Sequence, residues 1–394
     1  MKIAQTTIIP IELYTYELRK YIERIFLGKG ILKYFSPDDS IVGICRELLP
    51  DETKLYYLNL HSSNVKVIFF IEAGMILLME NIFNTDFQNK QLDDINKILK
   101  NRRQLHLEVI EERDIIIDMI KKFSAEFNKI KKIERQEFFK IKIHYAFSFF
   151  TILSNFISFE QEINFAKILA EPSLVGNEDM ISIERESLID DLSKVPNNRL
   201  KGIKNIDLFS NAQTFITWAG IASLVDNEDD WQFTKNLLTI LETRAQSIWN
   251  KCYCVNKDID YIIKHEIYVK KNKLEKIYWN TINTIDMAKG VISSTFSSRA
   301  GIFFEKIIDT SNLNKEVDKL KEKLFLLERY LKEKNEKSEK MYKKFLNFSL
   351  LLIMTFTMLP ALVETPILRK PLYGWLIVCI VLIIGVIVNL KIDS

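Results

Sequence analysis

Two long uncharged segments near the C-terminal end constrain this chain more than any other feature. Residues 345–363 (FLNFSLLLIMTFTMLPALV) and 372–390 (LYGWLIVCIVLIIGVIVNL) are each nineteen residues long and contain no charged side chain. The hydrocarbon core of a bilayer is about 30 Å thick and needs about 20 apolar residues in a helix. A buried helix of a soluble core rarely has this length, so the sequence predicts two transmembrane helices joined by a short loop.

Positive charge gathers on the N-terminal side of the first segment. Six lysines precede it, Lys332, Lys334, Lys337, Lys340, Lys343 and Lys344, whereas the loop between the segments contains only Arg369 and Lys370. Loops rich in lysine and arginine stay in the cytoplasm. Residues 1–17 lack the apolar core of a signal peptide. We therefore expect both termini in the cytoplasm and the protein in the inner (cell) membrane of a bacterium.

A heptad pattern lies before the lysine cluster. Its apolar positions are separated by alternating steps of four and three residues: Leu313, Val317, Leu320, Leu324, Leu327 and Leu331. Such a seam packs against another helix. No Pro or Gly interrupts residues 312–359, which predicts one helix roughly 70 Å long. The seam either packs within the chain or forms a stalk against other copies, and the run into an uncharged segment favours the stalk.

The rest of the chain predicts a helix-rich domain of mixed type. Only 11 Gly and 8 Pro occur in 394 residues, which disfavours a many-turned all-β fold. Strands are predicted at residues 54–60, 65–72 and 75–80, one strand or a strand pair at 213–225, and helices at 231–249 and 258–289. The expected fold class is α+β, with a helix-dominated cytoplasmic domain (1–298), a stalk helix (299–344) and a C-terminal two-helix transmembrane hairpin (345–363 and 372–390).

Composition and missing motifs exclude several classes of protein. Lysine and arginine number 55 and aspartate and glutamate 52, a balance that argues against binding nucleic acid. Four cysteines are too few for a disulfide scaffold. The chain has no glycine-rich phosphate loop, no Gly-x-Ser-x-Gly and no His-Glu-x-x-His. We therefore expect no enzymatic activity, and the sequence identifies no metal-ligand set.

A pore would require several copies, because two helices per chain cannot enclose one. On a helical wheel one face of the first uncharged segment carries Asn347, Leu351, Met354, Thr355 and Met358, the predicted pore-lining residues. Continuing the heptad register selects Phe348, Leu352, Thr355 and Leu359 instead, so only Thr355 belongs to both sets. Rings of Leu and Met would gate by dewetting. The alternative is that these residues only pack helix against helix.

Candidate ligand-binding residues lie in two places. Arg102 and Arg103 could pair with phosphate through their guanidinium groups, although adjacent arginines on a helix are often only solvated. Trp218 and Trp231 flank an acidic run that begins at Asp226, where an adenine could stack beside a carboxylate. The plain alternative is a core tryptophan beside a capped helix start. The acidic run could equally bind a regulatory divalent cation.

The order of these elements resembles the CorA family of divalent-cation channels. A large cytoplasmic domain is followed by a long helix, an uncharged segment, a short loop with Glu364 and Pro366, a second segment that starts Tyr373-Gly374-Trp375, and a short tail. Family members carry Gly-Met-Asn at the outer end of the first span. This chain has Met358-Leu359-Pro360-Ala361 there, so magnesium selectivity is not implied.

The resemblance implies a function of the following kind. Divergent CorA-like proteins without Gly-Met-Asn include membrane effectors of type III CRISPR systems, which are homopentamers by likeness and respond to a nucleotide second messenger, adenylated S-adenosylmethionine (SAM-AMP). We therefore expect a lipid-membrane channel that acts in antiviral defence by perturbing membrane integrity, with SAM-AMP or a divalent cation as its ligand. The alternatives are a CorA-like magnesium or divalent-cation transporter and a membrane-tethered interaction protein.

Overall fold

The computed structural model describes residues 1–13, 16–36, 39–49, 53–58, 65–71, 74–84, 114–123, 125–127, 142–143, 147–154, 160–170, 205–206, 212–217, 220–264, 271–293 and 298–363. The chain forms two compact units. The first contains Met1–Tyr261 and Asn280–Glu322, and the second contains Ile262–Trp279 and Lys323–Ser394.

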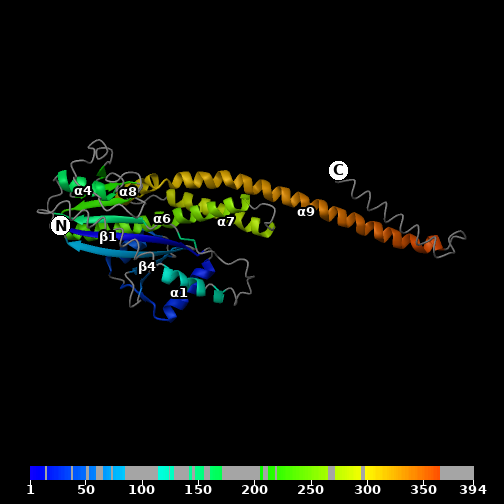
Figure 1. Cartoon of the computed structure of the whole chain (residues 1–394), viewed down its shortest axis with the longest axis horizontal. Helices are drawn as coiled ribbons and strands as arrows, with labels where there is room; N and C mark the ends of the chain where they lie inside the picture. The colour runs from blue at the N-terminus through cyan, green and yellow to red at the C-terminus, as the bar shows by residue number, and fades with distance from the viewer. Residues whose placement is uncertain are drawn as a thin grey trace, which may run out of the picture. The chain divides into compact units, whose positions relative to one another are not determined.

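The first unit is built on one mixed sheet (Figure 1). Among the described residues its strands are β1 (Lys2–Glu12), β2 (Leu32–Tyr34), β3 (Lys54–Leu58), β4 (Val65–Ile71), β5 (Gly74–Asn84), β6 (Lys142–Ile143), β7 (Phe147–Leu153), β8 (Asn205–Ile206), β9 (Ala212–Ile216) and β10 (Ile221–Val225). Their order is β2-β3-β4-β5-β1-β7-β10-β9-β8, with β6 paired to β1. The neighbours are antiparallel except for β7 and β10, which are parallel.

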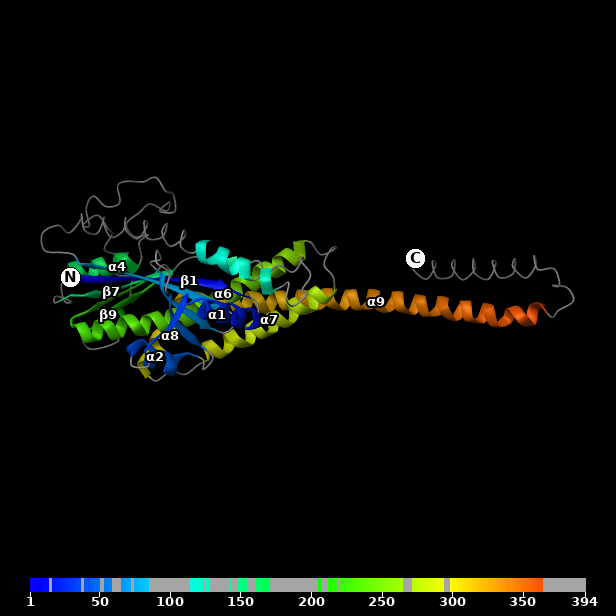
Figure 2. The same ribbon diagram turned by 90° about the horizontal axis from the view of Figure 1, so that it is seen from below.

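The described part of the chain also contains several helices. Those with defined bounds are α1 (Tyr16–Gly28), α2 (Ser40–Leu48), α4 (Glu160–Ala170), α6 (Glu228–Lys264), α7 (Lys271–Ile292), α8 (Ser298–Thr310) and α9 (Leu313–Val363). Residues 114–123 are also helical. Helix α6 runs in nearly the same direction as β1, and two views agree on this (Figures 1 and 2).

Strand β1 is the centre of the sheet and is buried on both faces. It pairs with β5 over its full length, Lys2 opposite Asn84 through Glu12 opposite Gly74. On its other edge it pairs with β7 only as far as Ile8 and with β6 from Ile11. Pro10, which has no N–H to donate, lies between the described parts of these two ladders.

One face of the sheet carries the odd-numbered residues of β1 and two separate apolar clusters. Side chains alternate between the faces of a strand, so residues 3, 5, 7, 9 and 11 share this face. The α1 cluster joins Ile9 and Ile11 to Ile68, Phe70, Leu77, α1 and the helix at 114–123. The α4 cluster joins Ile3 to Phe150, Phe215, Leu224 and the buried side of α4. Both clusters consist of buried apolar side chains.

Helix α6 covers the opposite face and carries α2 beside it. Asn236 Nδ2 donates to Ser40 Oγ at 2.8 Å, and an Arg244 guanidinium nitrogen donates to the Leu48 carbonyl at 2.6 Å. Both contacts advance by eight residues on each helix, so α2 and α6 run parallel. The C-terminal carbonyl of α2 is thereby satisfied by a charged donor from α6.

The helical segment that the heptad pattern predicted is present, but it begins after a break. Asn312 separates α8 from α9 with a φ of 56°, a left-handed conformation that asparagine tolerates. Its carbonyl accepts the Glu316 N–H at 3.2 Å and so opens α9. Helix α9 then continues without interruption to Val363.

The seam of α9 is used within the chain rather than left open. Leu313, Val317 and Leu320 are buried in the first unit, and Leu327 is buried in the second. Leu324 and Leu331 are half-buried. Four of the six seam positions are therefore already covered in a single chain, which favours the internal packing interpretation over a seam reserved for other copies.

The predicted fold class is wrong. The first unit is organised by a ten-stranded sheet that the helix-dominated description missed. Within the residues that the structure describes, no helix has both the length and the apolar content needed to cross a membrane. The described side chains of α9 are charged in nearly every turn up to Lys344. The second predicted span, 372–390, lies outside the described residues, and so do the side chains of 355–363.

Several local predictions are confirmed. Strands β3, β4 and β5 lie where the early β-like runs predicted them, and β4 pairs antiparallel with β5 through Ile71 and Gly74. The predicted strand pair at 213–225 is β9 and β10. The two predicted helices correspond to α6 and α7, although α6 continues through the expected break to Lys264.

We expect Leu320→Asp to unfold the chain rather than only change its assembly. Leu320 is fully buried, and a carboxylate there lacks both water and a counter-charge, so the free energy of unfolding should fall by at least about 3 kcal/mol. Phe325→Asp on the same helix is the matched control, because Phe325 is 72% exposed and should change stability by about 0.5 kcal/mol or less. Denaturant unfolding measures both. A folded Leu320→Asp protein of lower mass would instead support a seam between copies.

Candidate functional site

The candidate site is a polar layer where the first turns of α6 meet the sheet. Asn227 caps the helix: its Oδ1 accepts the Asp230 N–H at 2.8 Å. Glu228, Asp229 and Asp230 fill the first turn, where the positive end of the helix dipole favours negative charge. The acidic run is therefore explained by the start of the helix.

Trp231 anchors this end of α6 to the sheet. Its side chain is buried, and its Nε1–H donates to the Thr151 carbonyl at 2.9 Å. The ammonium groups of Lys2 and Lys235 lie 4.1 and 5.0 Å from the centroid of its ring. Lys2 also pairs with Glu228. Two cations therefore lie against the ring of this one indole.

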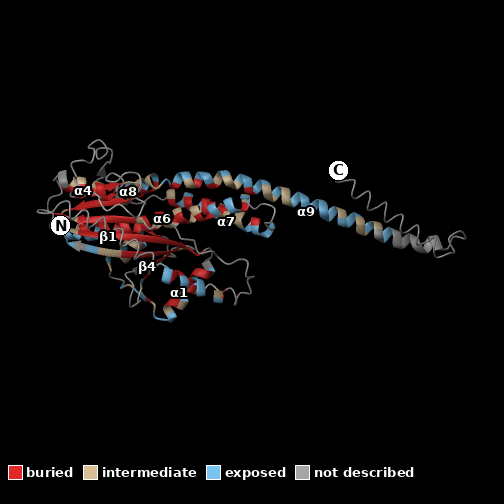
Figure 3. Cartoon of the chain, viewed as in Figure 1, coloured by how far each residue is buried: buried red, intermediate tan, exposed pale blue. Residues whose placement is uncertain are grey.

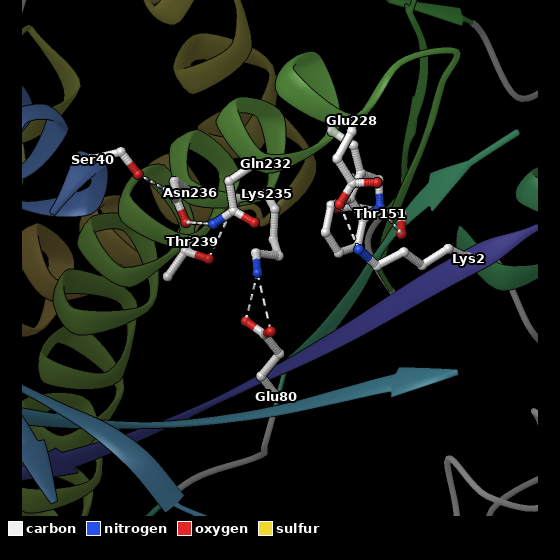
Figure 4. Close-up of polar contacts among 10 residues, drawn as sticks. Lys2, Ser40, Glu80, Thr151, Glu228, Gln232, Lys235, Asn236 and Thr239 are labelled. Atoms are coloured by element: carbon white, nitrogen blue, oxygen red, sulfur yellow. Dashed lines mark hydrogen bonds and ion pairs between the residues drawn. The ribbon is translucent and has the colours of Figure 1, made fainter. Parts of the chain in front are cut away.

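Lys235 and Glu80 form an ion pair inside this layer. The ammonium lies 3.0 Å from both carboxylate oxygens, and the side chains are 8% and 29% exposed (Figure 4). Glu80 is opposite Thr6 in the β1–β5 register, so both face α6. Among the described residues, the buried hydroxyls of Thr6 and Thr151 have no hydrogen-bond partner. The ion pair therefore lies in a polar but incompletely satisfied part of the interior.

The polar character continues along the buried side of α6. Lys235, Thr239, Glu242, Gln246 and Asn250 follow one another at steps of four, three, four and four residues, and all are buried. Residues so spaced share one face of a helix. Glu242 is completely buried, and Gln246 Nε2 donates to it at 3.2 Å. Burial raises the pKa of the Glu242 carboxyl from 4.5 to about 8, so at neutral pH it is protonated.

A polar contact also joins α6 to the start of α9. Asn256 Nδ2 donates to Glu316 Oε2 at 3.0 Å, and Glu316 pairs in turn with Lys319 at 2.6 Å. All three residues belong to the first unit. The polar groups of α6 therefore run from the sheet to the first turn of the helix that leaves this unit.

The predicted ligand residues are not brought together in one described site, and some of them lie outside the described residues. Asp226 is half-buried just before α6, where it accepts from Asn227 Nδ2 at 3.0 Å. Arg102, Arg103 and Trp218 lie outside the described residues. Trp231 matches the plain alternative, a core tryptophan beside a capped helix start. In the part of the chain that is described, no group of three His, Cys, Asp or Glu side chains is arranged to hold a metal ion.

The predicted pore residues all lie on α9. Asn347 is exposed, Leu351 is half-buried and Met354 is 58% exposed. Thr355 and Met358 belong to the same helix, but their side chains lie outside the description. Part of the predicted lining face is therefore exposed in the described chain. That these residues line a pore stays a prediction.

Sequence reasoning missed the residues that make up the polar layer. Lys235 and Glu80 are separated by 155 residues, and nothing local to either one marks the other. A signal for Glu242 existed: it lies on the same helical face as Thr239 and Gln246, next to the apolar residues Leu238, Leu241 and Ala245. A charged residue on such a face is a candidate for a buried, perturbed acid.

Comparison of the chain with protein-family models, with curated proteins and with solved structures gave no match. The resemblance to CorA channels therefore rests on the order of sequence elements alone. Function has to be argued from the geometry of α6 and α9.

We expect the Lys235–Glu80 pair to contribute more to stability than the Lys2–Glu228 pair. Lys235→Met leaves a carboxylate with little water around it and should cost about 1–3 kcal/mol, and adding Glu80→Gln should restore part of that loss. A double-mutant cycle from denaturant unfolding gives the coupling energy. The matched cycle of Lys2→Met and Glu228→Gln, in which both side chains are more exposed, should give less than about 1 kcal/mol. Equal couplings would contradict a buried polar layer.

We expect Glu242 to make stability fall as pH rises from about 4.5 to about 8. In this window the unfolded chain releases the proton while the folded chain keeps it, so the free energy of unfolding falls by about 1.4 kcal/mol per pH unit and then levels off. Glu242→Gln keeps the neutral hydrogen-bonding shape and should remove this slope. Denaturant unfolding at several pH values tests it, with exposed Glu228→Gln as the control. An unchanged slope in Glu242→Gln would show that this carboxyl is not the buried acid.

Proposed function

We propose that the protein acts at a lipid membrane as an oligomeric CorA-like channel, whose first unit responds to a ligand and whose helix α9 works at the membrane. A type III CRISPR-associated antiviral effector that responds to a nucleotide such as SAM-AMP is the form of this proposal that the resemblance implies. One observation supports it most: α9 is largely exposed beyond the first unit (Figure 3), and its last described turns carry a run of exposed, large apolar side chains.

These apolar side chains are aligned. Tyr342, Leu346, Leu350 and Ile353 are separated by four, four and three residues, which places them on one face of the helix. All four are between 46% and 66% exposed. An aligned face of this size normally marks a membrane or protein contact, because water solvates it poorly.

The charges beside this face favour a membrane over a protein partner. Lys340, Lys343 and Lys344 come directly before Phe345, and all lie on the exposed part of α9. Basic side chains next to an apolar helical face bind anionic lipid headgroups while the apolar face contacts the acyl chains. The six lysines from Lys332 onward are interspersed with glutamates until Glu339, and between Glu339 and Phe345 the only charged side chains are lysines. The change in charge therefore coincides with the start of the apolar face.

The polar contacts of α6 supply a route from the first unit to α9. Asn256 holds Glu316 in the first turn of α9, and Asn256 lies on the same helix as the Lys235–Glu80 pair. A change in the packing of α6 on the sheet would therefore be felt at the start of α9. Such a coupling is what a ligand-responsive membrane protein needs, whereas a plain tether needs none.

The test is binding to liposomes and release of their contents. Wild-type protein should float with liposomes that contain anionic lipid, and loaded liposomes should then leak ions. Leu346→Asp with Leu350→Asp should reduce flotation at least tenfold, because two carboxylates would enter the acyl region. Phe325→Asp, exposed on the same helix but outside the aligned face, is the matched control and should float normally.

The outcomes separate the candidate functions. Flotation without leakage under any ligand would indicate a membrane-tethered interaction protein. Leakage of magnesium alone would indicate a divalent-cation transporter. Flotation that survives the double substitution would show that the aligned face does not bind the membrane and would remove the observation on which the proposal rests.

A further inference from the structure

The two compact units of the chain carry opposite net charge. The second unit contains 16 lysines and arginines and 8 aspartates and glutamates, a net charge of +8, whereas the first contains 39 and 44, a net charge of −5. Charge that is separated in this way orients a protein near a charged surface. An anionic surface attracts the second unit and repels the first.

Part of the positive charge lies where α6 ends and α7 begins. Residues 262–279 contain five lysines and two glutamates. Lys271 lies 3.8 Å from Glu275, but both side chains are more than 40% exposed, and so exposed an ion pair contributes little. Four lysines of this segment are described and exposed, and we refer to them as the hairpin lysines: Lys264, Lys271, Lys273 and Lys276.

The stability of α7 does not explain these lysines. Its first turn contains Lys271 and Lys273 and no acidic residue, although cations are unfavourable at the positive end of a helix dipole. Helix α6 shows the favourable arrangement, with three acidic residues in its first turn. Contact with an anionic partner gives the hairpin lysines a role that the helix itself does not.

The hairpin lysines lie beside the part of α9 that precedes the aligned apolar face. Ile262, Leu274 and Leu327 are buried, and all three belong to the second unit. The start of α7 lies beside α9 in two views (Figures 1 and 2). Glu333 and Lys334 are the last half-buried residues of α9 before an exposed stretch at 335–343. The cover of α9 in this unit therefore ends near Lys334.

The remaining distance to a bilayer is short enough for electrostatic attraction. Helix α9 rises about 16 Å between Lys334 and Phe345, where its uncharged segment begins. The headgroup layer on one side of a bilayer takes up about 5–8 Å of this rise, which leaves about 10 Å. The Debye length is about 8–10 Å near physiological ionic strength. The charge of the hairpin lysines therefore reaches the headgroups even when α9 stands upright.

We propose that the hairpin lysines form a second contact with the membrane, an electrostatic one with anionic lipid headgroups. The proposal rests on the proposed function, because α9 has to hold the second unit at the bilayer. It adds a fixed orientation, in which the second unit faces the membrane and the acidic first unit is directed away from it. A lysine at such a surface strengthens binding about fivefold, and less at one Debye length.

The test is flotation of the full-length protein with phosphatidylcholine vesicles that contain increasing fractions of phosphatidylglycerol. Lys264→Glu with Lys271→Glu and Lys273→Glu should weaken binding to the anionic vesicles about tenfold at about 50 mM salt and about twofold or less at about 500 mM, because salt screens the attraction. All three side chains are exposed, so the variant should unfold at the same denaturant concentration as the wild type. Leu346→Asp with Leu350→Asp should instead reduce flotation at both salt concentrations.

A charge-matched variant controls for net charge. Lys20→Glu with Lys33→Glu and Lys54→Glu reverses three exposed lysines of the first unit and should weaken binding less than about twofold. If both triple variants lose the same binding, net charge alone acts and the proposal is wrong. If the hairpin variant floats normally but has a lower oligomeric mass, the lysines bind the acidic unit of a second copy, and the proposal is again wrong.

The two levels of the argument fail differently. Wild-type protein that does not float with any vesicle contradicts the proposed function and, with it, this proposal. Wild-type protein that floats, with a hairpin variant that has the same dependence on anionic lipid and salt, contradicts only the electrostatic contact.

Discussion

The pairing of β1 on both of its edges is the interaction on which the first unit depends. Eleven residues pair with β5, and seven pair with β7 on the other edge. Because helices cover both faces as well, nearly every residue of β1 is buried. The strand consequently contains polar residues, Gln5, Thr6 and Thr7, that have no access to water and must be satisfied by their neighbours. The polar layers on both faces follow from this requirement.

Helix α6 shows how the chain provides polar partners on one face of the sheet, and what this costs in stability. It brings a lysine to Glu80 and an indole N–H to the backbone of β7. It also buries a neutral carboxyl, Glu242, and several hydroxyls without partners among the described residues. An apolar helix would pack more stably on an apolar sheet. The retention of buried polar groups is therefore better explained by a packing that has to change than by one that has to be as stable as possible.

The sequence predicted elements whose signal is local and missed those that depend on distant residues. The β4–β5 hairpin, the β9–β10 pair and the continuity of α9 were predictable from alternation, turn residues and the absence of breakers. Strand β1 was missed because burial on both faces erases the alternation and Pro10 argues against a central strand. Of the predicted ligand residues only Asp226 and Trp231 lie in the described part, and the Lys235–Glu80 pair required the fold to be known. The predicted transmembrane hairpin is not part of the described structure.

Helix α9 has a buried part and an exposed part, and a helix that only completed the core would not require both. Its first turns bury Leu313, Val317 and Leu320 in the first unit, so that end is fixed by ordinary core packing. Its later turns expose charged side chains and then an aligned apolar face whose described side chains are about half exposed or more. A helix that served only to complete the core could end soon after Leu320. The residues beyond it lower solubility unless another surface covers them, and the basic side chains at their start identify an anionic lipid surface as the best-matched cover.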